Sequence, residues 1–195
     1  MPTWSRKVLR ILEKRGIEYP PDLLRILTPL GDLGAAAYYH RVFGLTDPDE
    51  VLFAEMDEYA VPRYRDEIPA KPEVADALRE LLARGKRVSV LTASPHKVVD
   101  PCLARNGILD LFEHVWSCDD FFTTKADPMI YHKAADALGC RVNEIIFCDD
   151  NINAIRSAKN AGCQTVAVFD ESSREDEALM RAVADRYIYT FKELL

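Results

Sequence analysis

Apolar and polar residues follow two different patterns along the chain. From residue 3 to residue 68, apolar residues recur at spacings of three and four, as in Val8, Leu9 and Leu12. This spacing places apolar side chains on one face of a helix, so it predicts an all-helical region. Prolines such as the pair Pro20 and Pro21 stand where these helices are expected to end.

After residue 70 the pattern changes to an alternation of strands and helices. Such alternation is typical of βαβ units. The predicted fold class is therefore α/β: a Rossmann-like parallel sheet with helices on both faces, and a small helical cap. The predicted domains are a cap over 1–68 and a core over 69–195, joined by a short hinge near 66–70. The pattern predicts strands over 87–93, 114–118, 144–150 and 164–169, and helices over 73–85, 96–108 with a break at Pro101, 128–139, 152–162 and 173–184.

Composition and charge narrow the classes of partner. The chain has 195 residues, of which 48% are hydrophobic, enough to fill a sizeable core. Its 25 basic and 32 acidic residues give a net charge of -7, and the basic residues are scattered. This argues against nucleic acid or an anionic membrane as the main partner. No apolar run approaches the roughly 20 residues of a membrane helix, and no signal peptide is recognisable, so we expect a cytoplasmic protein.

Two adjacent aspartates, Asp149 and Asp150, end the expected strand over 144–150. Ligands of doubly wound sheets bind at the carboxyl ends of the strands. Two neighbouring carboxylates repel each other there, and a bound cation would remove the conflict. Oxygen ligands without a nearby His or Cys cluster suit Mg²⁺. The alternative is that Asp150 caps the following helix while Asp149 is solvated.

Two further segments lie at strand ends. Thr92, Ala93 and Ser94 end the strand over 87–93 just before a helix, where hydroxyls and backbone N–H groups favour an anion. They predict a phosphate-binding turn, although Ser and Thr are also common helix caps. Lys125 follows the strand over 114–118 and its loop, from where it can neutralise a phosphate. The alternative for Lys125 is a solvated surface charge.

In this order, the segments LTAS, KADP and FCDDNINAIRSAKNAG resemble the haloacid dehalogenase superfamily of magnesium-dependent phosphohydrolases. The resemblance is to the branch of phosphoglycolate phosphatases and β-phosphoglucomutases, which carries a helical cap, and it covers nearly the whole chain. It implies that Thr92 and the amides around it bind phosphate and that Lys125 neutralises the phosphate and the nucleophile. It also implies that Asp149 and Asp150 hold Mg²⁺, and that the partner is a small phosphorylated metabolite.

The sequence departs from the family pattern at two positions near these motifs. Ala126 follows Lys125 where family members often have proline. Ala154 stands where some members carry a further acid or a glycine. Metal binding is therefore expected to rest on Asp149 and Asp150 alone.

A larger departure concerns the nucleophile. In the family, an aspartate on the first, central strand attacks phosphorus and a second aspartate two residues later acts as general acid and base. No such DxDx[TV] motif precedes the predicted cap. None of Asp22, Asp32 and Asp57 follows an apolar strand, so none is predicted to be the nucleophile. Two hypotheses follow: a truncated chain, or a natural relative that lacks its nucleophile.

The strand that carries the nucleophile lies, in the family, between the strands that here bear Thr92 and Asp149. Without it, unpaired backbone groups are expected at that place, and a homodimer contact, a swapped segment or an altered strand order would have to cover them. Three functions remain as hypotheses: a phosphatase or phosphomutase that is inactive as this chain, a non-catalytic phosphate-binding or regulatory relative, and a plain α/β interaction domain.

Overall fold

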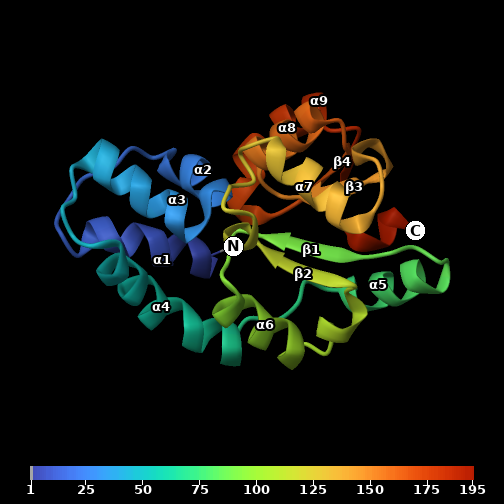
Figure 1. Cartoon of the computed structure of the whole chain (residues 1–195), viewed down its shortest axis with the longest axis horizontal. Helices are drawn as coiled ribbons and strands as arrows, with labels where there is room; N and C mark the ends of the chain where they lie inside the picture. The colour runs from blue at the N-terminus through green and yellow to red at the C-terminus, as the bar shows by residue number, and fades with distance from the viewer. Residues whose placement is uncertain (1) are drawn as a thin grey trace.

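The computed structural model describes residues 2–195; Met1, the first residue of the predicted cap, lies outside them. Helices fill the region up to Asp66, as predicted (Figure 1). Their apolar faces meet in one cluster that includes Trp4, Leu12, Tyr39 and Met56. The elements of this helical region (residues 2–66) are α1 (Pro2–Glu13), α2 (Leu23–Leu27), a 3-10 turn (Thr28–Leu30), α3 (Gly31–Tyr38), a π-helical turn (Tyr39–Phe43) and α4 (Asp49–Asp66).

Strands and helices alternate over the remainder, which confirms the predicted α/β class. The strands are β1 (Ser89–Thr92), β2 (His114–Ser117), β3 (Ile146–Asp149), β4 (Gln164–Val168) and β5 (Arg186–Ile188). The helices are α5 (Val74–Ala83), α6 (His96–Arg105), α7 (Met129–Leu138), α8 (Ile152–Ala161) and α9 (Glu177–Val183). Short 3-10 turns lie at Leu109–Leu111, Cys118–Phe121, Val142–Glu144, Glu171–Asp176 and Phe191–Leu194.

The strands form two parallel sheets rather than one, and the division falls between β1 and β3, where unpaired backbone groups were expected. β1 pairs with β2 from Ser89–His114 to Thr92–Ser117, and β3, β4 and β5 form a second sheet in that order. No pairing joins β1 to β3 within residues 2–195, so each of these strands has one edge without a strand partner. In Figure 1, β1 and β2 lie side by side, apart from β3 and β4.

The two sheets nevertheless share one hydrophobic core. Ala93 and Cys118, which follow β1 and β2, belong to the same buried cluster as Phe147 of β3 and Ile152 and Ile155 of α8. The spacing of Ile152, Ile155 and further buried residues of α8 directs one face of this helix at the sheet. This packing brings the carboxyl ends of β1 and β3 into one region of the molecule.

Two local predictions are corrected. The helix over 96–108 was expected to break at Pro101, yet α6 runs unbroken through it. Pro101 removes one backbone hydrogen bond. The helix persists because Val98, Val99 and Cys102, on either side of Pro101, are buried in the protein. The strand β5 was not predicted, because three residues are too few to show a periodicity.

Hydrogen bonds attach the helical region to the rest of the chain. The backbone N–H of Lys125 donates to Pro29 O at 3.0 Å, and Asn153 Nδ2 donates to Arg25 O at 2.9 Å. Arg25 also forms an ion pair of 2.7 Å with Asp176. Among residues 2–195, no helix is long and apolar enough to cross a bilayer.

Candidate active site

The turn that follows β1 is closed by a hydrogen bond from the backbone to a side chain. Thr92 Oγ1 accepts a hydrogen bond from the backbone N–H of Ser94 at 3.1 Å, and both Ala93 and Ser94 are buried. α6 begins at His96 with Pro95 as its N-cap, and no side chain caps it. The first amides of α6 are therefore not taken by a Ser or Thr cap, and they add to an environment that favours an anion.

The Gly31 backbone packs directly over this turn. A Cβ atom at Gly31 would lie 3.2 Å from Ala93 O and 3.7 Å from Cys118 Cβ. Gly31 also has a φ of +70°, which residues other than glycine rarely adopt. The start of α3 can therefore approach the carboxyl ends of β1 and β2 this closely only because position 31 is glycine.

Lys125 is buried and points at β3. Its Nζ donates to Asp149 Oδ2 at 2.7 Å, and the two side chains are only 11% and 8% exposed. Burial acts to lower the pKa of Lys125, but the charge of Asp149 and this hydrogen bond outweigh it and raise the pKa overall. Lys125 is therefore a fixed cation at the end of β3, which excludes the alternative of a solvated surface charge.

Tyr131, which the sequence patterns did not single out, holds the Lys125 backbone in place. Its hydroxyl lies 2.8 Å from Lys125 O and 3.1 Å from Ala154 O. The ring is buried and packs edge-on against Phe147, with 4.9 Å between the centroids. Tyr131 therefore connects the loop that carries Lys125 to the first turn of α8.

Asp149 and Asp150 have different environments. Asp149 Oδ1 accepts from the Asn151 N–H at 2.8 Å, while its Oδ2 binds Lys125. Burial, followed by the charges of Asp149 and Asp170, raises the pKa of Asp150 to about 6. The alternative in which Asp150 caps the next helix is wrong, because Asn151 Oδ1 accepts from the first amides of α8, at 2.9 and 3.1 Å.

The donor set at Asp149 and Asp150 fits part of a magnesium site. The pKa of Asp150 is raised first by burial and then by its carboxylate neighbours, so a bound cation would stabilise its charged form. Mg²⁺ takes one or two protein carboxylates and keeps water or phosphate as its other ligands. Within the described residues, no group of three or more His, Cys, Asp or Glu side chains is placed to hold a metal.

Tyr64, in the last turn of α4, lies close to the site and was not predicted. Burial is the main cause that raises its pKa to about 12; the charges of Asp32 and Asp150 add to this, and the neighbouring Ser94 side chain opposes it. The phenol thus lies within reach of both the turn after β1 and the end of β3. No sequence spacing relates Tyr64 to these strands, so only the fold could identify it.

Of the aspartates that were not predicted to be nucleophiles, Asp32 lies nearest to the site. It follows Gly31, forms a buried ion pair with Lys7 and contributes to the raised pKa of Tyr64. Asp57 pairs with Lys97 at 2.5 Å. Asp22 precedes α2 and its side chain makes no capping hydrogen bond.

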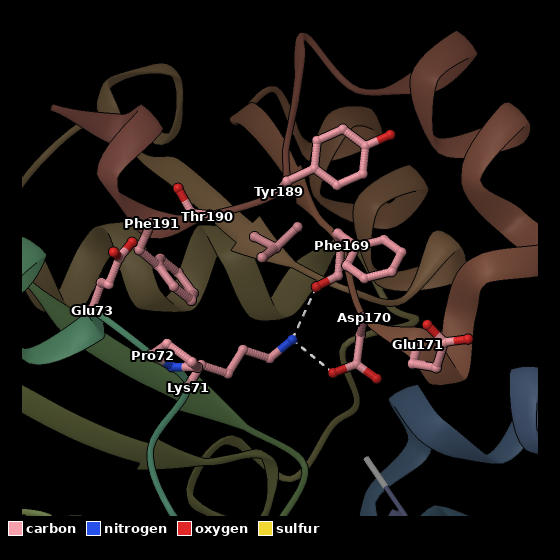
Figure 2. Close-up of a pocket in the computed structure, with 10 residues that line it drawn as sticks. Lys71, Pro72, Glu73, Phe169, Asp170, Glu171, Tyr189, Thr190 and Phe191 are labelled. Atoms are coloured by element: carbon pink, nitrogen blue, oxygen red, sulfur yellow. Dashed lines mark hydrogen bonds and ion pairs between the residues drawn. The ribbon is translucent and has the colours of Figure 1, made fainter.

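A cavity of about 280 Å³ opens beside the end of β4 (Figure 2). Lys71 crosses it and donates to Phe169 O at 3.1 Å and to Asp170 Oδ2 at 2.6 Å. Burial acts to raise the pKa of Asp170, but the hydrogen bonds from Lys71 and Ser172 lower it overall. Both members of this ion pair act on Asp150: the charge of Asp170 raises the pKa of Asp150, and the charge of Lys71 lowers it.

Comparison with known proteins gives a family match. A family model described as "haloacid dehalogenase-like hydrolase" matches residues 6–162. Phosphoglycolate phosphatase of Pectobacterium atrosepticum is 33% identical over 96 residues, which cover 49% of this chain and 41% of that protein. (S)-2-haloacid dehalogenase of Pseudomonas sp. strain YL is 32% identical over 93 residues, covering 48% and 40%. The matched part of the chain thus spans about half or less of these curated relatives.

Solved structures match the fold over almost the whole chain. The phosphate complex of CbbY from Rhodobacter sphaeroides has a TM-score of 0.79 at 24% identity, over 99% of this chain and 89% of that one. A predicted phosphoglycolate phosphatase from Haemophilus somnus has a TM-score of 0.75 at 20% identity, with the same coverage. At these identities the likeness supports the fold alone.

Proposed function

The chain belongs to the haloacid dehalogenase-like hydrolase family, and we propose that it carries the phosphate-binding and magnesium-binding residues of a phosphohydrolase for small phosphorylated metabolites. The observation that carries this proposal is the buried contact of 2.7 Å between Lys125 and Asp149. It places a fixed cation beside Asp150, whose pKa is raised. The names of the relatives make phosphoglycolate the first substrate to test.

Phosphate binding is assigned to Thr92, the turn after it and Lys125. The Lys125 ammonium has three N–H donors and gives one to Asp149, so two remain for phosphate oxygens. The Thr92 hydroxyl and the Ala93 amide come from the turn before the N-terminus of α6, in which the Ser94 amide already donates to Thr92 Oγ1. Charge-assisted hydrogen bonds of this kind are about twice as strong as neutral ones, which favours a dianionic ligand.

Metal binding is assigned to Asp150 first and to Asp149 second. Asp149 already binds Lys125 and the Asn151 amide, so its main effect is to orient the Lys125 cation. Asp150 makes the larger electrostatic gain from a cation, because burial and Asp149 disfavour its charged form. Magnesium bound there would supply positive charge that polarises the phosphate oxygens.

Nucleophilic attack is not assigned to any described residue. Asp32 and Asp57 lie in the helices α3 and α4 and not at the end of a strand, and Asp149 is assigned to orienting Lys125. We therefore propose that this chain binds phosphate and magnesium without turning a substrate over. This behaviour is shared by the second candidate function, a natural relative that binds phosphate and has no catalytic role.

The edges of β1 and β3 that lack strand partners are where an additional parallel strand would complete the sheet. We propose that a second copy of the chain covers them, as the expected homodimer contact. Sedimentation at several protein concentrations tests this: a dimer supports the contact, and a monomer at all concentrations rejects it without affecting the phosphate site.

Calorimetric titration with MgCl₂ and with orthovanadate, a phosphate mimic, tests the binding residues. We expect Asp150→Asn to remove magnesium binding and Lys125→Met to weaken vanadate binding at least about tenfold. Asp136→Asn and Lys86→Met, which change exposed charges elsewhere, are the matched controls. Unchanged magnesium binding in Asp150→Asn would exclude the proposed metal site. Rapid hydrolysis of an aryl phosphate, abolished by Asp150→Asn, would show that a nucleophile is present after all.

A further inference from the structure

A second cavity, of about 370 Å³, lies between the helical region and α8, and we call it the seam cavity. Pro29 and Leu30 line it from the helical region, and Pro128 from the start of α7. Its volume falls within the range of small-molecule sites. Hydrogen bonds from Asn153 to Arg25 O and from Lys125 to Pro29 O join its two sides.

One face of α8 forms the polar side of the seam cavity. Asn153, Arg156, Ser157 and Asn160 all line it. Their spacing of three, four and seven residues places them on the same face of the helix. They supply a guanidinium, two amides and a hydroxyl, a set that is rich in hydrogen-bond donors.

The charge in the seam cavity is that of Arg156 alone. No Asp, Glu, Lys or His lines the cavity, and Arg156 forms no ion pair within residues 2–195. In a protein of net charge -7, this leaves one exposed guanidinium on the cavity wall. A single planar guanidinium carries one positive charge in a bidentate fork, which matches the charge and the geometry of one carboxylate.

Ser157 is the most deeply buried polar residue on this face of α8, at 4% exposed. Its Oγ makes no hydrogen bond of standard geometry within residues 2–195, but it lies close enough to the buried Tyr131 hydroxyl to act on the pKa of that group. The donors on this face that remain for a ligand are therefore those of Arg156 and Asn160, which are both exposed.

We propose that the seam cavity binds a small organic carboxylate with a compact apolar body. Arg156 binds the carboxylate through paired N–H donors, and the Asn160 amide donates to its remaining lone pairs. Pro29, Leu30 and the other apolar residues on the opposite wall contact the apolar body. The occupied cavity holds the 25–30 segment against α8, so the ligand stabilises the attachment of the helical region.

Titration with benzoate tests this proposal, followed by the NMR shifts of the Arg156 and Asn160 side chains and by calorimetry. We expect saturable binding that Arg156→Met weakens about tenfold or more, as for loss of a charge-assisted contact. Arg156→Lys, which keeps the charge but not the planar fork, should weaken it less. Lys159→Met is the matched control, since Lys159 pairs with Asp185 outside the cavity.

Inorganic phosphate distinguishes the seam cavity from the candidate active site. We expect phosphate to leave benzoate binding unchanged and to leave the Arg156 and Asn160 signals unshifted. Absence of saturable benzoate binding, or equal binding by wild type and Arg156→Met, would overturn the proposal. Displacement of benzoate by phosphate would overturn it as well, because it would place benzoate at the turn after β1.

Discussion

Replacing Lys125 by methionine should destabilise the folded protein by about 3 kcal/mol, because it leaves the Asp149 carboxylate buried without its cation. The Asp149 side chain is 8% exposed and keeps only the Asn151 N–H as a donor. Breaking a buried ion pair by removing one partner typically costs about 3–5 kcal/mol, and the remaining Asn151 hydrogen bond argues for the lower end. For a chain of this size the loss corresponds to about 6–12 °C in Tm.

A double-mutant cycle separates the ion pair from the packing of the lysine stem. Lys125→Met and Asp149→Asn should each be destabilising, and the double variant should cost less than their sum by about 2 kcal/mol or more, since neither charge is then left alone. Urea unfolding followed by circular dichroism, with EDTA present, gives all four values. Lys86→Met, at an exposed site, should stay within about 0.5 kcal/mol of wild type. A coupling energy within about 0.5 kcal/mol of zero would refute the buried contact.

Further predictions concern the charge of Asp150, the backbone at Gly31 and the cap of α8 at Asn151. In EDTA at pH 7, Asp150→Asn should stabilise the protein by about 3 kcal/mol, because the pKa of Asp150 rises from 3.8 to about 6 on folding. The wild type loses this stability as the pH rises towards about 6, where Asp150 ionises in the folded protein. Urea unfolding between pH 4 and 8 should therefore show that the two free energies of unfolding become more similar at the acid end. A difference that stays the same at every pH would contradict the shift. Magnesium binding by the wild type should accordingly weaken below about pH 6 in calorimetry. Gly31→Ala should cost about 1 kcal/mol more than Gly85→Ala in the same unfolding assay, since both have positive φ but only position 31 meets a backbone atom, Ala93 O at 3.2 Å. Asn151→Ala should lose about 1 kcal/mol with the cap of α8, whereas Asn160→Ala should lose little; equal costs would contradict the capping role.

The order of strands and helices was predictable because each strand is a short apolar run between turn residues. The strand expected over 144–150 is observed at Ile146–Asp149, and the one over 164–169 at Gln164–Val168. Such patterns report which side chains are buried and not which strands pair. The gap between β1 and β3 was therefore expected only from the family resemblance, which places the missing nucleophile strand between them, since both strands show the same apolar pattern with or without a partner there.

The candidate site was predictable where it depends on strand ends. The ends of parallel strands meet at one edge, so Lys125 and Asp149 were expected in one region. Their direct contact, and the different environments of Asp149 and Asp150, follow from packing that spacing does not encode. Tyr64 was beyond prediction for the same reason, because α4 reaches the site only through the tertiary fold.

A crystal structure of the protein grown with MgCl₂ and orthovanadate tests the central claim most directly. We predict a metal ion bound by Asp150, and an oxyanion within hydrogen-bond distance of both Lys125 Nζ and Thr92 Oγ1. An oxyanion bound elsewhere, with the Lys125–Asp149 ion pair intact and no metal at Asp150, would contradict it.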